Sequence, residues 1–226
     1  MSINVVERVD DFVKVQNILV SVSDKSGLEQ FIPNLTDINP QIQIYSTGGT
    51  YGRIREILGD SAAGRLMQVS DYTGQPETQG GLVKTLDFKI YLGLLTEKYN
   101  PAHQEDLART QAVAIDMVVV NLYPFKATIA KEGVTAEQAR GNIDIGGPCM
   151  IRASAKNYLR VASVVDPTDY DGILDDLRST KGMTSLSTRF RLAQKAFAHT
   201  AAYDRAIADY LGKQAIADVT SCYPEI

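Results

Sequence analysis

The sequence contains few of the side chains that hold transition metals or form disulfides. Two histidines and two cysteines among 226 residues argue against a zinc site of Cys or His ligands, which usually needs four protein ligands, and they leave no disulfide framework. The 23 basic residues are outnumbered by 27 acidic ones, so no overall positive field draws the chain to nucleic acid or anionic membranes. The longest apolar run, around residues 117–120, is far shorter than the ~20 residues of a membrane-spanning helix. The amino terminus does not resemble a signal peptide, and we therefore expect a cytoplasmic protein.

Short runs of β-branched residues alternate with helical patterns along the chain. Such alternation is typical of an α/β fold in which helices cover both faces of a parallel sheet. An interruption by glycines and a proline between residues 71 and 100 predicts an irregular, functional insertion there. The expected strands are Ile18 to Val22, Ile42 to Tyr45, Met117 to Asn121 and Val161 to Val165. The expected helices are Leu28 to Leu35, Thr50 to Leu58, Thr135 to Ile143 and Thr168 to Leu177.

From residue 187 onward the pattern predicts one long amphipathic helix. Phe190, Ala193, Phe197 and Ala201 recur at three- to four-residue spacing, with polar residues between them. Such a helix packs across its own domain or forms an interface with a second copy. The sequence leaves both interpretations open.

Two strand ends lead through small residues into helices. The turn at residues 21–27 holds Lys25 among serines, and the turn at residues 46–50 holds two glycines between Ser46 and Thr50. Glycines let a ligand approach the backbone, and the first N–H groups of a helix lack internal partners. Singly, each turn is explained as a helix cap. As a pair at the carboxyl ends of consecutive strands they favour a phosphate pocket, although no P-loop pattern is present.

Three later segments are more polar than simple connections require. Lys84 lies in a glycine-bounded segment, and residues 121–125 end the most apolar strand with an amide, a phenol and a proline. The segment 142–157 places a Gly-Gly turn and a helix between Asp144 and Lys156. Such a turn offers backbone N–H donors beside a carboxylate and an ammonium. The plainer interpretation is a structural ion pair between Asp144 and Lys156.

In this order, the segments resemble the inosinate (IMP) cyclohydrolase domain of bifunctional purine-biosynthesis proteins, in which a formyltransferase domain follows. The matching segments are SVSDKSGL, STGGT, GLVKTL, NLYPF, NIDIGG and ASAKN, and KAFAHTAAYD at residues 195–204. The resemblance implies a cyclohydrolase domain at residues 17–211, an extension at 1–16 and a tail at 212–226, without the formyltransferase domain. It also implies a three-layer, methylglyoxal-synthase-like α/β fold and a homodimer that needs no cofactor or metal.

The activity implied by the resemblance is closure of the ring of 5-formamidoimidazole-4-carboxamide ribotide (FAICAR) to IMP with loss of water. This is the last step of de novo purine biosynthesis, and its enzyme belongs to the hydrolases that act on C–N bonds of cyclic amidines. The reaction is intramolecular, so holding the two substituents face to face supplies much of the acceleration. A separately encoded formyltransferase is an expected partner.

The family's motifs also imply which residues do the work. Asp144 is expected to act as general base, and Lys156 is expected to keep it ionised. Tyr123 and Lys84 are expected to donate hydrogen bonds to the developing formyl oxygen. The predicted catalytic residues are Lys84, Tyr123, Asp144 and Lys156. The predicted substrate-binding residues are Ser21, Ser23, Lys25, Ser46, Gly48, Gly49, Thr50, Thr85, Asn121, Ile145, Gly146 and Gly147.

Beside Lys84 the chain departs from the family pattern. Leu82 stands in place of an arginine, Asp87 and Phe88 stand in place of a His-Pro pair, and Tyr91 stands in place of a histidine. One interpretation is drift in a loop that keeps its lysine. The other is an altered substrate contact, because Leu82 cannot donate hydrogen bonds and Asp87 carries the opposite charge.

Two other functions fit the same fold. A non-catalytic nucleotide- or phosphate-binding regulatory module, like the allosteric module of carbamoyl-phosphate synthetase, would use the same phosphate turns but would not need the predicted catalytic set. Methylglyoxal synthase uses aspartate and histidine, whereas His103 and His199 lie in no motif of that enzyme. We therefore expect the cyclohydrolase activity first, the binding module second and the synthase last.

Overall fold

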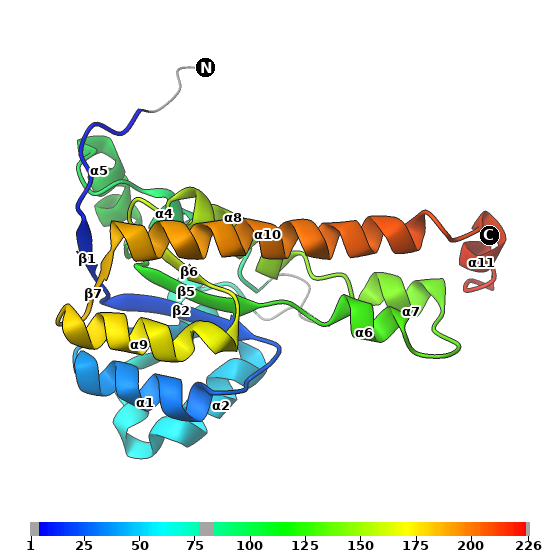
Figure 1. The fold of residues 1–226 in the computed structure, drawn as a ribbon, viewed down its shortest axis with the longest axis horizontal. Helices are drawn as coiled ribbons and strands as arrows, with labels where there is room; N and C mark the ends of the chain where they lie inside the picture. The colour runs from blue at the N-terminus through cyan, green and yellow to red at the C-terminus, as the bar shows by residue number, and fades with distance from the viewer. Residues whose placement is uncertain (1–4, 77–83, 225–226) are drawn as a thin grey trace.

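Strand β2 (Asn17–Val22) lies at the centre of a parallel sheet in the computed structural model, which describes residues 5–76 and 84–224 (Figure 1). Ile18 of β2 lies opposite Ile44 on one side and Met117 on the other, and every pairing in this sheet is parallel. The strand order is β4-β3-β2-β5-β6, with β3 at Gln43–Ser46, β4 at Leu66–Gln68, β5 at Met117–Asn121 and β6 at Ala162–Val164.

Helices cover both faces of the sheet, which makes a three-layer fold (Figure 1). Ile18 and Val119 pack into the core beneath α1, α2 and α9, whereas Leu19 and Val118 pack into the core beneath α4, α8 and α10. The expected three-layer α/β architecture is therefore confirmed. One layer consists of α1 (Leu28–Ile38), α2 (Gly48–Leu58) and α9 (Tyr170–Ser179). The other consists of α4 (Phe88–Leu95), α8 (Gly146–Lys156) and α10 (Leu186–Leu211).

The predicted irregular insertion at residues 71–100 is wrong in part. It contains the end of α3 (Val69–Thr73) and all of α4, which begins at Phe88 because the Asp87 side chain accepts a hydrogen bond from the Lys89 N–H. Ile90 and Leu94 then bury the apolar face of α4. The remaining elements are α5 (Pro101–Thr110), α6 (Phe125–Ile129), α7 (Ala136–Gly141), α11 (Ile216–Thr220) and the 3-10 turns Gly59–Ala62 and Pro167–Asp169.

A second, two-stranded sheet ties the amino-terminal arm to the body. Strands β1 (Phe12–Lys14) and β7 (Met183–Ser185) pair antiparallel. The guanidinium of Arg189, which is completely buried, donates to the carbonyl oxygens of Asp10 at 2.8 Å and Asp11 at 3.2 Å. A buried guanidinium requires such acceptors, and here they fix the arm in place.

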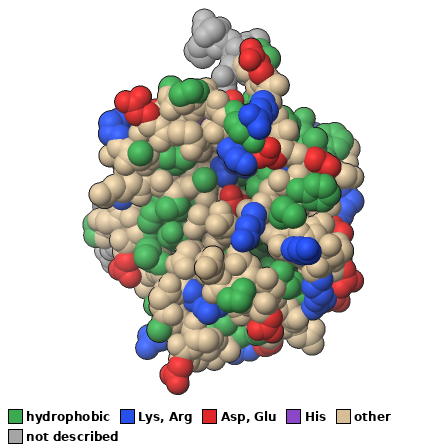
Figure 2. Space-filling view, turned by 90° about the vertical axis from the view of Figure 1, so that its left-hand side faces the viewer, with side chains coloured by type: hydrophobic (Ala, Val, Ile, Leu, Met, Phe, Trp, Pro, Cys, Tyr) green, Lys and Arg blue, Asp and Glu red, His purple; other side chains and the backbone are tan. Residues whose placement is uncertain are grey.

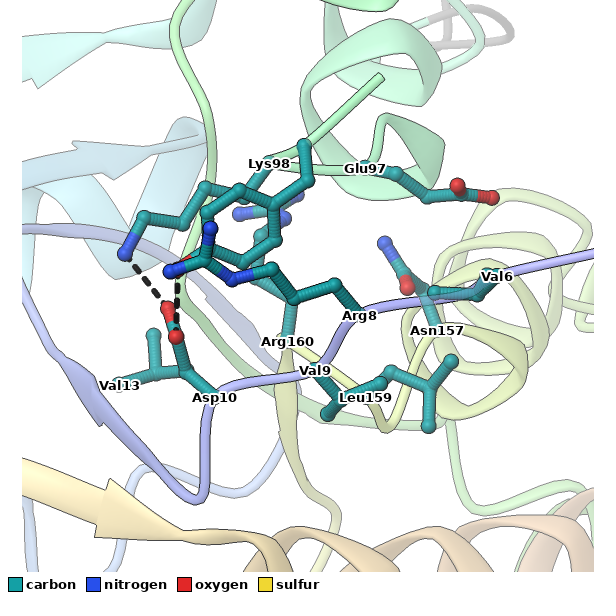
Figure 3. Close-up of a pocket in the computed structure, with 11 residues that line it drawn as sticks. Val6, Arg8, Val9, Asp10, Val13, Glu97, Lys98, Asn157, Leu159 and Arg160 are labelled. Atoms are coloured by element: carbon teal, nitrogen blue, oxygen red, sulfur yellow. Dashed lines mark hydrogen bonds and ion pairs between the residues drawn. The ribbon is translucent and has the colours of Figure 1, made fainter.

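The same arm covers a small pocket at the sheet's amino-terminal end (Figure 3). Asp10 accepts hydrogen bonds from Lys98 Nζ and Tyr99 Oη, each at 2.5 Å, and Arg8 lies over the Tyr99 ring. The pocket has a volume of about 30 Å³, which is room for one or two water molecules. Its side chains are engaged with one another, so we assign it a structural role.

The predicted long helix is confirmed as α10, which runs for 26 residues. In Figure 1 it extends past the sheet toward α6, α7 and α11, at the opposite end of the molecule from β1 and β7. Figure 2 shows the end of the molecule that holds β1 and β7, where basic, acidic and apolar side chains are intermixed. Over the described ranges, no helix is long and apolar enough to cross a membrane.

Candidate functional site

A large cleft opens at the carboxyl ends of the central strands. Its volume is about 550 Å³, against about 30 Å³ for the pocket of Figure 3, and lies in the range typical of small-molecule sites. After β2 the chain proceeds to β3 and β4 on one side and later to β5 and β6 on the other. The cleft therefore lies at the point where the strand order reverses, which is where open α/β sheets bind ligands.

Nearly every residue that the sequence predicts for the site lines this cleft. All predicted site residues except Ser46 and Lys156 line it. Sequence reasoning missed several lining residues whose only signal was their position beside predicted ones. They are Val22, Thr47, Leu86, Val120, Gly141, Asn142, Ile143 and Met150.

One end of the cleft is built to bind an anion. Helix α2 begins at Gly48, and the Gly48 and Gly49 N–H groups find no acceptor in the described part of the chain. A Cβ built on Gly48 would lie 3.5 Å from Lys84 Nζ, and one built on Gly49 would lie 3.9 Å from Lys25 Nζ. Neither lysine forms an ion pair with a described residue. Two ammonium groups and a helix N-terminus thus meet at this end of the cleft, and they supply the positive charge and the N–H donors that bind an anion.

Two hydroxyls that the sequence assigned to the phosphate are already bonded to the backbone. Ser46 is buried and donates to the Val20 carbonyl oxygen at 2.7 Å, so it faces the sheet rather than the cleft. Thr50 Oγ1 donates to the Val22 carbonyl oxygen at 3.0 Å and accepts from the Val22 N–H at 3.1 Å. Ser46 does not line the cleft, whereas Thr50 does, and the expected phosphate contacts of these hydroxyls stay predictions. Both fasten β3 and α2 to β2.

Asn121 supports the lysine-bearing loop at the end of β2. Its Oδ1 accepts hydrogen bonds from the Ser23 and Asp24 N–H groups at 2.7 and 2.9 Å, and its Nδ2 donates to the Asp24 carbonyl oxygen at 2.8 Å. These bonds fix the backbone of the loop that carries Lys25. The amide also lines the cleft, so the expected substrate contact of Asn121 stays a prediction beside this structural role.

Asp144 lies at the start of α8, where the loop after α7 enters the cleft. Its Oδ1 accepts a hydrogen bond from the Gly147 N–H at 2.9 Å. Burial raises the pKa of the Asp144 carboxyl above its ordinary value of 3.8, while the backbone amides of Gly147 and Tyr123 act in the opposite direction. A carboxylate with a raised pKa, hydrogen-bonded and open to a cleft, is suited to proton transfer.

Lys156 does not accompany Asp144. It is the last residue of α8, exposed at the carboxyl end, whereas Asp144 precedes the amino end. The 11 residues of this helix separate the two by about 15 Å along the axis. The expected ion pair is therefore absent within the chain, and Asp144 is held by backbone amides instead.

Lys84 and Tyr123 border the cleft from two different segments. The Tyr123 side chain is 56% exposed, so its hydroxyl is free to meet a ligand. The ammonium of Lys84 lies beside Gly48, at the anion end, rather than beside Asp144. A Cβ on Gly146 would lie 2.9 Å from Thr85 Oγ1, so the lysine-bearing segment packs closely over the start of α8.

The departures from the family pattern lie mostly outside the cleft lining. Leu82 falls outside the described residues. Asp87 is buried as the N-cap of α4, Phe88 is exposed without lining the cleft, and the Tyr91 hydroxyl lies beside Cys149. Asp87 thus replaces the family's histidine with a helix cap, a local structural role.

Asp87→Ala is expected to lower the free energy of unfolding by about 1 kcal/mol, because the Lys89 N–H loses its acceptor. Affinity of the cleft for inorganic phosphate should stay unchanged, since Asp87 does not line it. Urea unfolding and calorimetric titration measure the two quantities. Weaker phosphate binding at unchanged stability would contradict the assignment.

Family comparisons agree with this geometry. Residues 27–149 match the MGS-like domain family, and residues 154–225 match the AICARFT/IMPCHase bienzyme family. The bifunctional purine biosynthesis protein PurH of Magnetococcus marinus is 47% identical over 198 residues, which are 88% of this chain and 36% of that protein. PurH of Acetivibrio thermocellus is 46% identical over 200 residues, which are 88% of this chain and 37% of that protein.

A solved structure titled "Crystal structure of ForH" is similar over nearly its whole length. It shares 30% sequence identity with a TM-score of 0.75, and the match covers 87% of this chain and 97% of that one. The chain spans little more than a third of the length of its PurH relatives. It belongs to the MGS-like domain family and corresponds to the cyclohydrolase part of the AICARFT/IMPCHase bienzymes.

Proposed function

We propose that the chain is an IMP cyclohydrolase that closes the ring of FAICAR in purine biosynthesis. The observation that carries the proposal is the pairing, in one cleft, of an anion site with a partly buried carboxylate. Lys25 and the α2 N-terminus would hold the 5′-phosphate, and Asp144 would lie near the base. The PurH relatives are named for purine biosynthesis, which supports this substrate class.

In the proposed reaction, the carboxamide nitrogen forms a bond to the formyl carbon, and the formyl oxygen leaves as water. That water carries one hydrogen from the carboxamide nitrogen and one from the formamide nitrogen, so the atoms balance. Asp144 accepts the carboxamide proton as the nitrogen attacks. Tyr123 donates to the oxygen on which charge develops, and Lys84 reaches that oxygen only if its ammonium swings away from Gly48.

The proposal is tested by mixing the purified protein with FAICAR and following the absorbance of the hypoxanthine ring. Formation of IMP well above the spontaneous rate supports a cyclohydrolase. Tight binding of IMP without conversion would instead identify a nucleotide-binding module, because the anion site serves both functions. Neither conversion nor binding would reject both.

Replacing Lys25 by alanine is expected to weaken IMP binding by about 10-fold or more, because a hydrogen bond to the charged phosphate is lost. Inosine, which lacks the phosphate, should bind the variant and the wild type equally. Calorimetric titration of both ligands measures this difference. Lys213→Ala, an equal charge change at an exposed site outside the cleft, serves as control, and an equal loss of inosine affinity would contradict the phosphate role.

A homodimer and a separately encoded formyltransferase stay predictions of the resemblance. The outward side of α10 carries Phe190 and Phe197, which are 46% and 39% exposed. Exposed aromatic side chains on one helix face give a second copy an apolar surface to pack against. We therefore place the predicted subunit interface along α10.

A further inference from the structure

Tyr203, on α10, reaches the loop that carries Asp144. Its hydroxyl oxygen accepts a hydrogen bond from the Asp144 N–H at 2.8 Å, and the hydroxyl lies 3.5 Å from the Asn142 carbonyl oxygen, which can accept its proton. These contacts join positions about 60 residues apart in the chain. Tyr203 does not line the cleft, so it acts on a ligand only through this loop.

Among the described residues, Tyr203 is the hydrogen-bond partner of the Asp144 N–H, whereas the N–H groups of Asn142 and Ile143 bond back to α7. The loop connects the end of α7 at Gly141 to the start of α8 at Gly146. The Asp144 carboxylate is held by the backbone N–H groups of Gly147 and Tyr123, but the Asp144 main chain is held by Tyr203. Removing the Tyr203 hydroxyl would leave the hydrogen bond between the Gly147 N–H and the Asp144 carboxylate in place. It would free the Asp144 peptide, which sets the direction of that carboxylate.

Tyr203 itself is rigidly placed. Its side chain is buried, and its ring lies edge-on to Phe125 with the ring centroids 6.2 Å apart. Helix α10 packs along α8 and β6, so the hydroxyl projects from the largest helix of the fold. A hydroxyl on such a support can hold a loop in one orientation.

We propose that Tyr203 is a positioning residue that fixes the Asp144 main chain and thereby aims the carboxylate at the substrate. This inference rests on the proposed function for its kinetic consequence, but the contact itself can be measured without turnover. The proposed contact gives α10 a role in the active site in addition to its role in packing.

The chain offers a matched control in Tyr210. It lies two turns further along α10, and its ring packs edge-on against the same Phe125 at 5.8 Å. In the described residues its hydroxyl forms no hydrogen bond, whereas that of Tyr203 holds the loop. Tyr203→Phe and Tyr210→Phe therefore remove the same atom from similar rings.

For Tyr203→Phe we expect kcat to fall about 10-fold while KM changes less than twofold, because binding groups stay and the reacting geometry loosens. Hydrogen exchange of the Asp144 amide, followed by NMR, should become at least about 10-fold faster. Tyr210→Phe should change neither quantity. Thermal unfolding checks that both variants fold.

Unchanged exchange at the Asp144 amide in Tyr203→Phe would overturn the inference, as would equal kinetic losses in both variants. A rise in KM at constant kcat would also overturn it, since that result indicates weaker substrate binding rather than a misoriented Asp144 carboxylate. If the wild type does not convert FAICAR, the proposed function fails, while the exchange experiment still decides whether Tyr203 holds the loop.

Discussion

Asp144→Asn is expected to slow FAICAR cyclisation by about 10²–10⁴-fold, because the variant cannot accept the carboxamide proton. IMP affinity should change little, since the asparagine oxygen can still accept the Gly147 N–H and the anion end of the cleft is untouched. Rates from the absorbance of the hypoxanthine ring, with calorimetric Kd values for IMP, separate the two effects. Equal rates in both proteins would remove Asp144 from the chemistry.

The pH profile provides a second test of the same residue. Burial raises the pKa of Asp144, and a general base works only when it is ionised. The wild-type rate should therefore rise with pH through an apparent pKa above the ordinary carboxyl value of about 3.9. This limb should be missing from the residual activity of Asp144→Asn. Its persistence in the variant would assign the titration to another group.

The sheet could be predicted because its strands have a simple pattern. The continuous apolar runs of β2 and β5 reflect burial on both faces, and residues that alternate along them enter two different cores. Strands β1, β4 and β7 have three residues each and none is buried throughout, so they lack the continuous apolar run by which the equally short β6 could be predicted. Helix α4 was not predicted because the glycines and the proline earlier in the segment indicate irregular structure. The N-cap residue Asp87 was therefore not recognised as the start of a helix.

At the site, the sequence predicted which segments meet but not where each polar atom points. Ser46 and Thr50 lie in the expected turn, yet the backbone of β2 takes both hydroxyls. Lys156 follows Asp144 by 12 positions, and only the structure shows that α8 is one continuous helix with the two residues at its opposite ends. The contact of Tyr203 with Asp144 depends on how α10 lies across the fold. Such directions come from tertiary packing, which a local pattern does not contain.

Gly147→Ala is expected to damage both activity and stability. A Cβ at this position would lie 2.6 Å from Asp144 Oδ2 and 2.6 Å from Leu122 Cδ2, closer than nonbonded atoms approach. Either the carboxylate or the start of α8 must move, because Leu122 is itself buried. A displacement of about 1 Å at a reacting group costs on the order of 10²-fold in rate. Overpacking should lower the free energy of unfolding by about 1–3 kcal/mol.

Gly141→Ala is the matched control, because Gly141 also lines the cleft and a Cβ there would meet nothing within 4 Å. It should keep its activity and its stability, measured by the same ring-closure assay and by urea unfolding. Similar losses in both variants would mean that the cleft tolerates no added methyl group anywhere. Loss in Gly147→Ala alone would show that the glycine is needed where the carboxylate and the helix start touch. Asp144→Asn is expected to lower the rate without disturbing the fold, so comparing the two variants separates the carboxylate's chemistry from its placement.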